Sequence, residues 1–274
     1  MKNDELMHYG VKGMKWGVRK KYYKSYMDRD RTIKEGSRVQ NISFGKAREI
    51  GDKPVYATHT SHDNNAYAGN YADSLNSIIR GDPYKNSIIL TRDVKIPSQK
   101  KAVETFVEMY DRDPKGMAES ISRAHADVLA FNGISKVYNY NVNRINKKFE
   151  KNGKDWVESK GYTIFNQSLM SDKDTKARDE YFNLLGKKGY DAILDVNDVQ
   201  SGYSDDPIIF IKPNNTMKNA KSRKLTADEI DLANARYRYD EALKKRGIID
   251  TLTYGEYRKA KKNLKRAERN QVNR

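Results

Sequence analysis

The sequence predicts an α+β fold: a central mixed or antiparallel sheet of about five strands with flanking helices, followed by a basic C-terminal helical hairpin. Three observations support this. Short apolar or alternating segments recur through the centre of the chain, as strands do. Longer segments with apolar residues three and four positions apart lie between them, as helices do. After residue 217 the chain becomes strongly basic and contains two helix-start signals.

Five segments have the pattern of strands. Residues 37–44 alternate polar and apolar side chains, which is typical of a half-buried strand. The other four are short and rich in β-branched or aromatic residues: 54–60, 87–91, 190–196 and 207–211. A turn-rich segment joins the last two, so we expect them to form a hairpin-like pair.

The predicted helices are separated by Gly, Pro and Asp. In the central region they cover 64–80, 98–110, 115–150 with an interruption near Gly133, and 176–185. Ser98 is a suitable N-cap for the second of them. Two Thr-x-x-Glu capping boxes, at Thr226 and Thr253, predict a pair of C-terminal helices over 226–246 and 253–270.

Charge divides the chain into three parts. Residues 1–34 hold 10 basic and 4 acidic residues, residues 35–217 hold 26 and 25, and residues 218–274 hold 17 and 8. We therefore expect a flexible basic N-terminal arm, a nearly neutral α+β domain and a basic helical tail with these limits. Basic arms attract nucleic acid, anionic membranes or acidic partners. The alternative is that they are simply soluble surface elements.

Several classes of protein are excluded by composition. The chain has no Cys, which excludes disulfides, thiolate zinc sites and a cysteine nucleophile. It has no apolar run near the roughly 20 residues that a membrane-spanning helix needs. The N-terminus lacks the apolar segment of a signal peptide. His59, His62 and Asp63 are close together but too few for a convincing zinc site, so no metal is expected.

The residues with the most chemical content are scattered over the central region. In chain order they are Arg38 in the first strand, the hydroxyl-rich segment 58–61, two tyrosines in 64–80, and the segment 189–210. The last contains Gly-Tyr-Asp-Ala-Ile, followed by Tyr-Ser-Asp-Asp-Pro-Ile-Ile-Phe. This layout resembles the ADP-ribosyltransferase fold over roughly residues 30–215. That family has an Arg or His in its first strand, a hydroxyl-bearing strand next, and its catalytic acid beside the last hairpin.

The resemblance implies that the domain binds NAD. An arginine would hold a phosphate or ribose by bidentate hydrogen bonds, a hydroxyl would support the acid, and an aromatic face would stack on nicotinamide. The cofactor-binding residues that it implies are Arg38, one of Thr58, Thr60 and Ser61, and either Tyr67 or Tyr71. Asp205 or Asp206 would be the catalytic carboxylate, which stabilises positive charge as the glycosidic bond of NAD breaks.

The acid departs from the family pattern. The family normally uses Glu, often as Glu-x-Glu, whereas this segment offers only Asp, whose side chain is one methylene shorter. A displacement of about 1 Å in a catalytic group can cost about 100-fold in rate. The sequence therefore leaves open whether the chain is an active NAD-dependent mono-ADP-ribosyltransferase.

A second resemblance concerns residues 8–19, which read HYGVKGMKWGVR. This segment is similar to a short N-terminal signature on head and structural-module proteins of tailed phages and prophages of Gram-positive bacteria. It implies a virion or host-cytoplasmic location. It also implies that phage structural proteins are the partners of the N-terminal arm.

Two functions from different classes follow. The first is a bacteriophage virion or head-assembly protein with an ADP-ribosyltransferase-like domain, whose basic arms contact capsid partners or nucleic acid. The alternative is an active transferase that modifies a host target. DNA or RNA binding by the C-terminal helices is a further hypothesis, because four tyrosines alternate there with Arg and Lys: Tyr237, Tyr239, Tyr254 and Tyr257. The same tyrosines would also suit ordinary helix packing.

Overall fold

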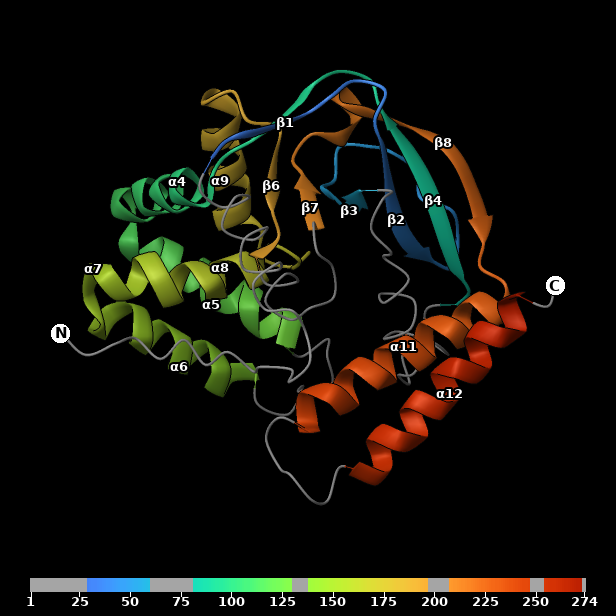
Figure 1. Cartoon of the computed structure of the whole chain (residues 1–274). Helices are drawn as coiled ribbons and strands as arrows, with labels where there is room; N and C mark the ends of the chain where they lie inside the picture. The colour runs from blue at the N-terminus through green and yellow to red at the C-terminus, as the bar shows by residue number, and fades with distance from the viewer. Residues whose placement is uncertain (1–28, 60–80, 130–137, 197–206, 247–253, 273–274) are drawn as a thin grey trace.

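The largest element of the computed structural model is a six-stranded sheet in which every ladder is antiparallel (Figure 1). The structure describes residues 29–59, 81–129, 138–196, 207–246 and 254–272. The strands, in their order across the sheet, are β6 (Ala192–Leu194), β7 (Pro207–Phe210), β3 (Val55–His59), β2 (Arg38–Phe44), β4 (Pro83–Leu90) and β8 (Met217–Lys224). The α+β class and the antiparallel sheet are thus confirmed. The described residues form one more strand in this sheet than the sequence predicts.

A second, two-stranded sheet pairs β1 (Arg31–Ile33) with β5 (Val94–Ile96). Neither strand was expected, because each is only three residues long. Asp30, just before β1, accepts hydrogen bonds from Ser98 N at 2.9 Å, Lys101 Nζ at 2.7 Å and the Tyr190 hydroxyl at 2.9 Å. The last residues of the expected N-terminal arm are therefore held by the α+β body.

The main sheet has two apolar faces, since successive residues of a strand point to opposite sides. On one face, Val39, Ala57, Ile88 and Ile208 belong to a single buried cluster. Ile50, in the β2–β3 connection, packs against that cluster. On the other face, side chains of β3, β6 and β7 pack against a layer of helices that Figure 1 shows gathered on one side of the sheet.

The helical layer follows β5 and precedes β6. Its elements are α4 (Gln99–Arg112), α5 (Pro114–Leu129), α6 (Tyr138–Lys151), α7 (Gly153–Trp156), the π-turn η3 (Val157–Gly161), α8 (Tyr162–Ser168) and α9 (Lys176–Lys187). Ser98 caps α4 as predicted, because its hydroxyl accepts the Lys101 N–H at 3.4 Å. The helical run from Gly153 to Ser168 was missed. The predicted helix over 64–80 lies outside the described residues.

Stacked aromatic side chains form the centre of the helical layer. The Phe165 ring lies 4.7 Å from Phe106 in a stacked arrangement and 4.9 Å from Tyr181 edge to face, all three rings being fully buried. The Tyr181 hydroxyl donates a hydrogen bond to the Ala102 carbonyl at 3.0 Å. Burial raises the pKa of Tyr162, on the same cluster, to about 12. The layer is therefore a rigid support for the sheet.

The strand β8 continues the sheet past the expected domain limit at residue 217. It pairs with β4 from Met217 to Lys224, after the short turn η4 (Pro213–Asn215). Its sequence, MKNAKSRK, is mostly polar and mostly exposed, so it lacks the alternation that marks the other strands. Edge strands rich in Lys are a known protection against pairing with other chains.

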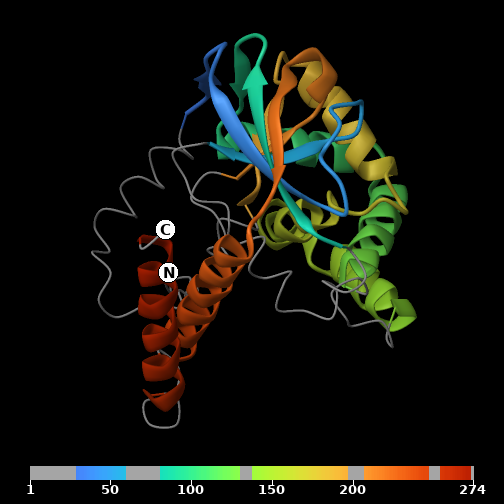
Figure 2. The same ribbon diagram turned by 90° about the vertical axis from the view of Figure 1, so that its right-hand side faces the viewer.

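Two C-terminal helices follow β8, as predicted: α11 (Ala227–Arg246) and α12 (Tyr254–Val272). The capping box at the start of α11 is confirmed, because Thr226 Oγ1 accepts the Glu229 N–H at 3.3 Å and Glu229 accepts the Thr226 N–H at 3.0 Å. Both views show α11 and α12 side by side, with α12 on the far side of α11 from the sheet (Figures 1 and 2). Thr253 lies outside the described residues.

Candidate functional site

One row of residues crosses the sheet near the end at which β2 begins. Gln40 is paired in register with Ser87 of β4 on one side and with Thr58 of β3 on the other. Thr58 is paired in turn with Pro207 of β7. The Asp195 N–H, just after β6, donates to the Pro207 carbonyl at 2.9 Å. The row therefore crosses four strands and ends at the residue after β6. We refer to Ser87, Gln40, Thr58, Pro207 and Asp195 as the polar row.

The side chains of the polar row lie on the helix side of the sheet. Their chain neighbours Val39, Ala57 and Ile88 point into the apolar cluster on the opposite face, so Gln40, Thr58 and Ser87 point away from it. Asp195 is assigned to the same side, because it lies two residues after Ile193, whose side chain packs in the helical layer.

Arg38 stands two residues before Gln40, at the first position of β2. Its side chain is exposed, and its Nη1 donates to Ser87 Oγ at 3.4 Å. Among the described residues Arg38 has no acidic partner. A guanidinium with free donors beside a polar row is suited to hold a phosphate or a carboxylate. The structure thus places Arg38 in the first strand of the main sheet, as the sequence predicts.

Thr58 occupies the middle of the polar row and is buried, with 1% of its surface exposed. Its hydroxyl has no hydrogen-bond partner within the described part of the chain. A buried polar group without a partner costs about 1–3 kcal/mol, so such groups are rare in native structures and call for an explanation. A ligand that exchanges a hydrogen bond with this hydroxyl would supply one.

The other predicted site residues lie outside the described residues. These are Thr60, Ser61, Tyr67, Tyr71, Asp205 and Asp206. Two of them are nevertheless tied to the polar row by the chain: Asp206 is bonded to Pro207, and Ser61 follows Thr58 by three residues. Along the chain, the segment 60–80 begins two residues after Thr58, and the segment 197–206 ends immediately before Pro207.

Sequence reasoning missed the other three polar members of the row, Gln40, Ser87 and Asp195. Asp195 is a buried carboxylate, 1% exposed, directly after the apolar strand β6. Its position in YDAILDV, where the apolar run ends in an acid, was the available signal. Gln40 becomes notable only through its register with Thr58 and Ser87, which the sequence does not show.

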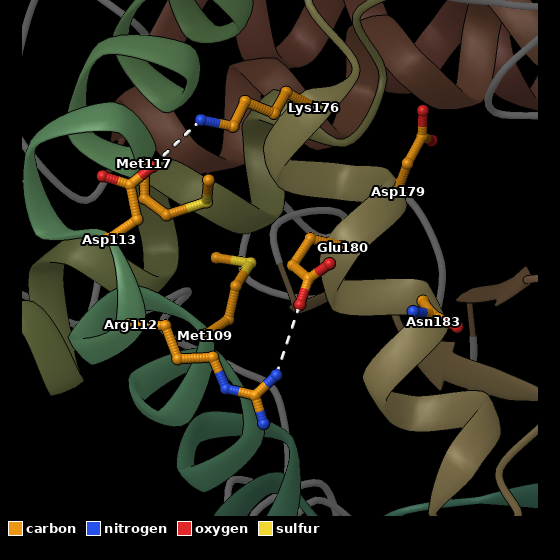
Figure 3. Close-up of a pocket in the computed structure, with 8 residues that line it drawn as sticks. All are labelled: Met109, Arg112, Asp113, Met117, Lys176, Asp179, Glu180 and Asn183. Carbon is orange, nitrogen blue, oxygen red and sulfur yellow. Dashed lines mark hydrogen bonds and ion pairs between the residues drawn. The ribbon is translucent and has the colours of Figure 1, made fainter.

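A hollow of about 540 Å³ lies in the helical layer, between α4, the start of α5 and α9 (Figure 3). Lys176 pairs with Asp113 at 2.9 Å, and Arg112 pairs with Glu180 at 3.4 Å. Met109 also lines the groove. Because its cations are paired with acids of the same groove, it is a weaker candidate for an anionic ligand than the polar row.

The histidines offer no second centre among the described residues. His125 of α5 is buried, and its Nε2 lies 2.7 Å from Gln167 Oε1. Burial lowers its pKa, so the ring is neutral at pH 7. Within the part of the chain that the structure describes, no three His, Asp or Glu side chains converge as metal ligands.

Comparison with known families gives one match, to a family of unknown function, DUF7211, over residues 1–22. The matched segment includes residues 8–19 and lies outside the described residues. Neither the curated proteins nor the solved structures contain a match to this chain. None of the described helices is both long enough and apolar enough to cross a membrane.

Proposed function

We propose that the α+β body is an ADP-ribosyltransferase-like domain that binds NAD over the polar row. The order of the strands supports this most strongly. The strand that begins with Arg38 lies next to the hydroxyl-bearing strand β3, and β3 lies next to the hairpin β6–β7. This is the neighbourhood that the sequence resemblance implies for the arginine, the hydroxyl and the acid.

The described side chains fit the parts of NAD. The exposed guanidinium of Arg38 offers bidentate hydrogen bonds to the diphosphate. Thr58, whose hydroxyl has no partner among the described residues, and Gln40 beside it offer hydrogen bonds to ribose or amide groups. Bound NAD would supply a nicotinamide leaving group and an electron-poor ribose carbon.

A carboxylate must lie near that ribose carbon, because positive charge develops there as the bond to nicotinamide breaks. Asp206 is assigned this role, since it precedes the first residue of β7 and is the acid that the family pattern indicates. Asp195 is assigned a positioning role: it is buried in the helical layer, and its backbone N–H bonds to the Pro207 carbonyl.

Nicotinamide release by the full-length protein tests this proposal. We expect wild-type protein to bind NAD and release nicotinamide, and Arg38→Ala and Asp206→Ala to abolish release. Arg112→Ala is the matched control, because it removes an exposed arginine of the α4–α9 groove and should leave release unchanged. Absence of NAD binding by folded wild-type protein contradicts the proposal. Equal loss in all three variants contradicts the assignment of the site.

We further propose that residues 1–22 attach the domain to phage head proteins, so that the chain acts within a virion or its assembly module. The resemblance of residues 8–19 supports this, and the family model that matches residues 1–22 has no assigned function. Purified particles of a phage that encodes the chain should contain it, and deletion of 1–22 should remove it from particles without lowering its amount in lysate. Equal incorporation of both forms would contradict the attachment role.

A further inference from the structure

The two faces of α12 differ sharply in chemistry. Ala260, Leu264 and Ala267 are partly buried, whereas the residues between them are exposed. Their spacing of four and three places them on one stripe of the helix. The helix that α12 packs beside is α11 (Figures 1 and 2), so we infer that this partly buried stripe faces α11.

The opposite face of α12 is basic. It carries the exposed cations Lys259, Lys262, Lys265, Arg266 and Arg269, and Lys261 is exposed at its edge, near Glu268. At about 100° per residue, Lys262 and Arg269 lie almost directly opposite the Ala–Leu–Ala stripe, with the other three around them. Glu268 lies near the edge of the stripe, and among the described residues none of the five cations is paired with an acid. We refer to these five residues as the α12 basic face.

Such a face is unusual for a helix that is merely solvated. Solvated helices normally mix both signs of charge and gain from Glu–Lys pairs three or four residues apart. Here like charges lie three, four and seven residues apart, an arrangement that destabilises a helix slightly. The negative charges of an anionic partner would attract these cations and offset the repulsion between them.

The side chains on the two faces of α12 indicate which kind of anionic partner fits it. A helix that lies in a membrane surface buries a broad face of bulky apolar residues, whereas the apolar stripe of α12 is narrow and faces α11. A helix that binds single strands by stacking presents aromatic side chains among its cations. The tyrosines of α12, Tyr254 and Tyr257, precede the stretch 259–270 that holds the basic face, and that stretch has no aromatic residue. What remains is contact with phosphates: from Lys259 to Arg269 the helix rises about 15 Å, over which duplex DNA carries about nine phosphate charges.

We propose that the α12 basic face binds the phosphate backbone of double-stranded nucleic acid without reading its sequence. This function is separate from NAD binding, because the polar row and α12 share no residue. It also assigns the interaction to lysines and arginines of one helix, and not to stacking by the four tyrosines of the tail.

Fluorescence anisotropy with labelled DNA duplexes of two unrelated sequences tests the proposal on the full-length protein. With five phosphate contacts, the slope of log K against log salt should be about −4.5, which is about a 500-fold loss of affinity between 50 and 200 mM salt. Both sequences should bind equally within about threefold.

The triple variant Lys262→Gln/Lys265→Gln/Arg269→Gln should reduce the magnitude of that slope by about 2.7 and weaken binding at least tenfold at 50 mM salt. The matched control is Lys115→Gln/Lys154→Gln/Lys160→Gln, which removes the same charge from exposed positions of the helical layer and should change binding less than threefold. Gln is a good helix former, so circular dichroism should show unchanged helix content in both variants.

Three results would overturn the proposal. One is absence of salt-dependent DNA binding by folded wild-type protein. Another is equal weakening by the two triple variants, which would show that only net charge matters. The third is preference for phosphatidylserine vesicles that duplex DNA does not displace, which would assign the face to a membrane surface.

Discussion

The α+β body and the C-terminal hairpin are stabilised in different ways. The body buries large side chains completely, including Phe106, Phe165 and Tyr181, in a nearly neutral chain segment. The α12 helix instead packs through small, partly buried residues and presents cations to solvent. This difference indicates that the body holds side chains in fixed positions for chemistry. The hairpin instead presents a charged surface and buries few large side chains. Each of the following changes tests part of this contrast.

The largest effect is expected in the aromatic core of the body. Phe165→Ala should lower the free energy of unfolding by about 3–5 kcal/mol, because it removes a fully buried ring and leaves a cavity beside Phe106 and Tyr181. Leu264→Ala in α12 should cost less, because Leu264 is only partly buried. Urea denaturation measures both, and equal costs would remove the contrast between the two regions.

A buried polar network should be the next most sensitive part of the body. Asn86, fully buried in β4, donates to Ser43 Oγ at 3.0 Å and accepts the Arg48 N–H at 3.0 Å, which ties the β2–β3 connection to the sheet. Asn86→Ala should cost about 1–3 kcal/mol, since it leaves buried partners unpaired. Lys85→Ala on the same strand is the control. If thermal denaturation shows no difference between them, the network has no stabilising role.

The hairpin should respond to acid at its first turn. Glu229 accepts hydrogen bonds from Arg223 at 2.5 and 2.6 Å, and these lower the pKa of Glu229 to about 2 from its usual 4.5. Because the pKa of Glu229 is lower in the folded than in the unfolded protein, its ionised form stabilises the fold at pH values above about 4.5. This stabilisation is lost as the pH falls from about 4.5 to 2. Hydrogen exchange at the start of α11 should therefore accelerate over this range. In Glu229→Gln the acceleration should be absent, and its persistence would assign it to another group.

A substitution at Thr58 should have the smallest effect on stability, and it should weaken NAD binding. Thr58→Val removes a buried hydroxyl that has no partner among the described residues, so stability should be unchanged or slightly higher. The same change should weaken NAD binding about fivefold, the value of one ordinary hydrogen bond. Calorimetry and thermal denaturation on the same samples give both numbers. A clear loss of stability would show that the hydroxyl has a structural partner.

Strands and helices with a clear pattern of apolar residues could be predicted from the sequence. Polar strand segments at the edge of the sheet could not. Alternation over 37–44 and the apolar runs of β3, β6 and β7 predicted those strands because each buries at least one face. The edge strand β8 and the polar start of β4 were missed, since edge positions are solvated and lose the pattern.

For the candidate site, the sequence predicted Arg38, and Thr58 as one of three possible hydroxyls, because residue type and strand position are local features. The sequence does not show that Gln40 lies beside Thr58, or that Asp195 lies beside Pro207. Gln40 and Asp195 belong to the row only because β2 pairs with both β3 and β4, and because the chain after β6 pairs back onto Pro207. Such long-range register depends on packing across the whole sheet.

Hydrogen exchange of the full-length protein, with and without millimolar NAD, tests the central claim most directly. NAD bound over the polar row should slow exchange in three separate segments: 38–41, 57–61 and 203–209. Exchange at 109–117 and 176–183, which line the groove in the helical layer, should stay unchanged. Slowing confined to the groove, or no slowing anywhere in the folded protein, would contradict the assignment of the sheet end as an NAD site.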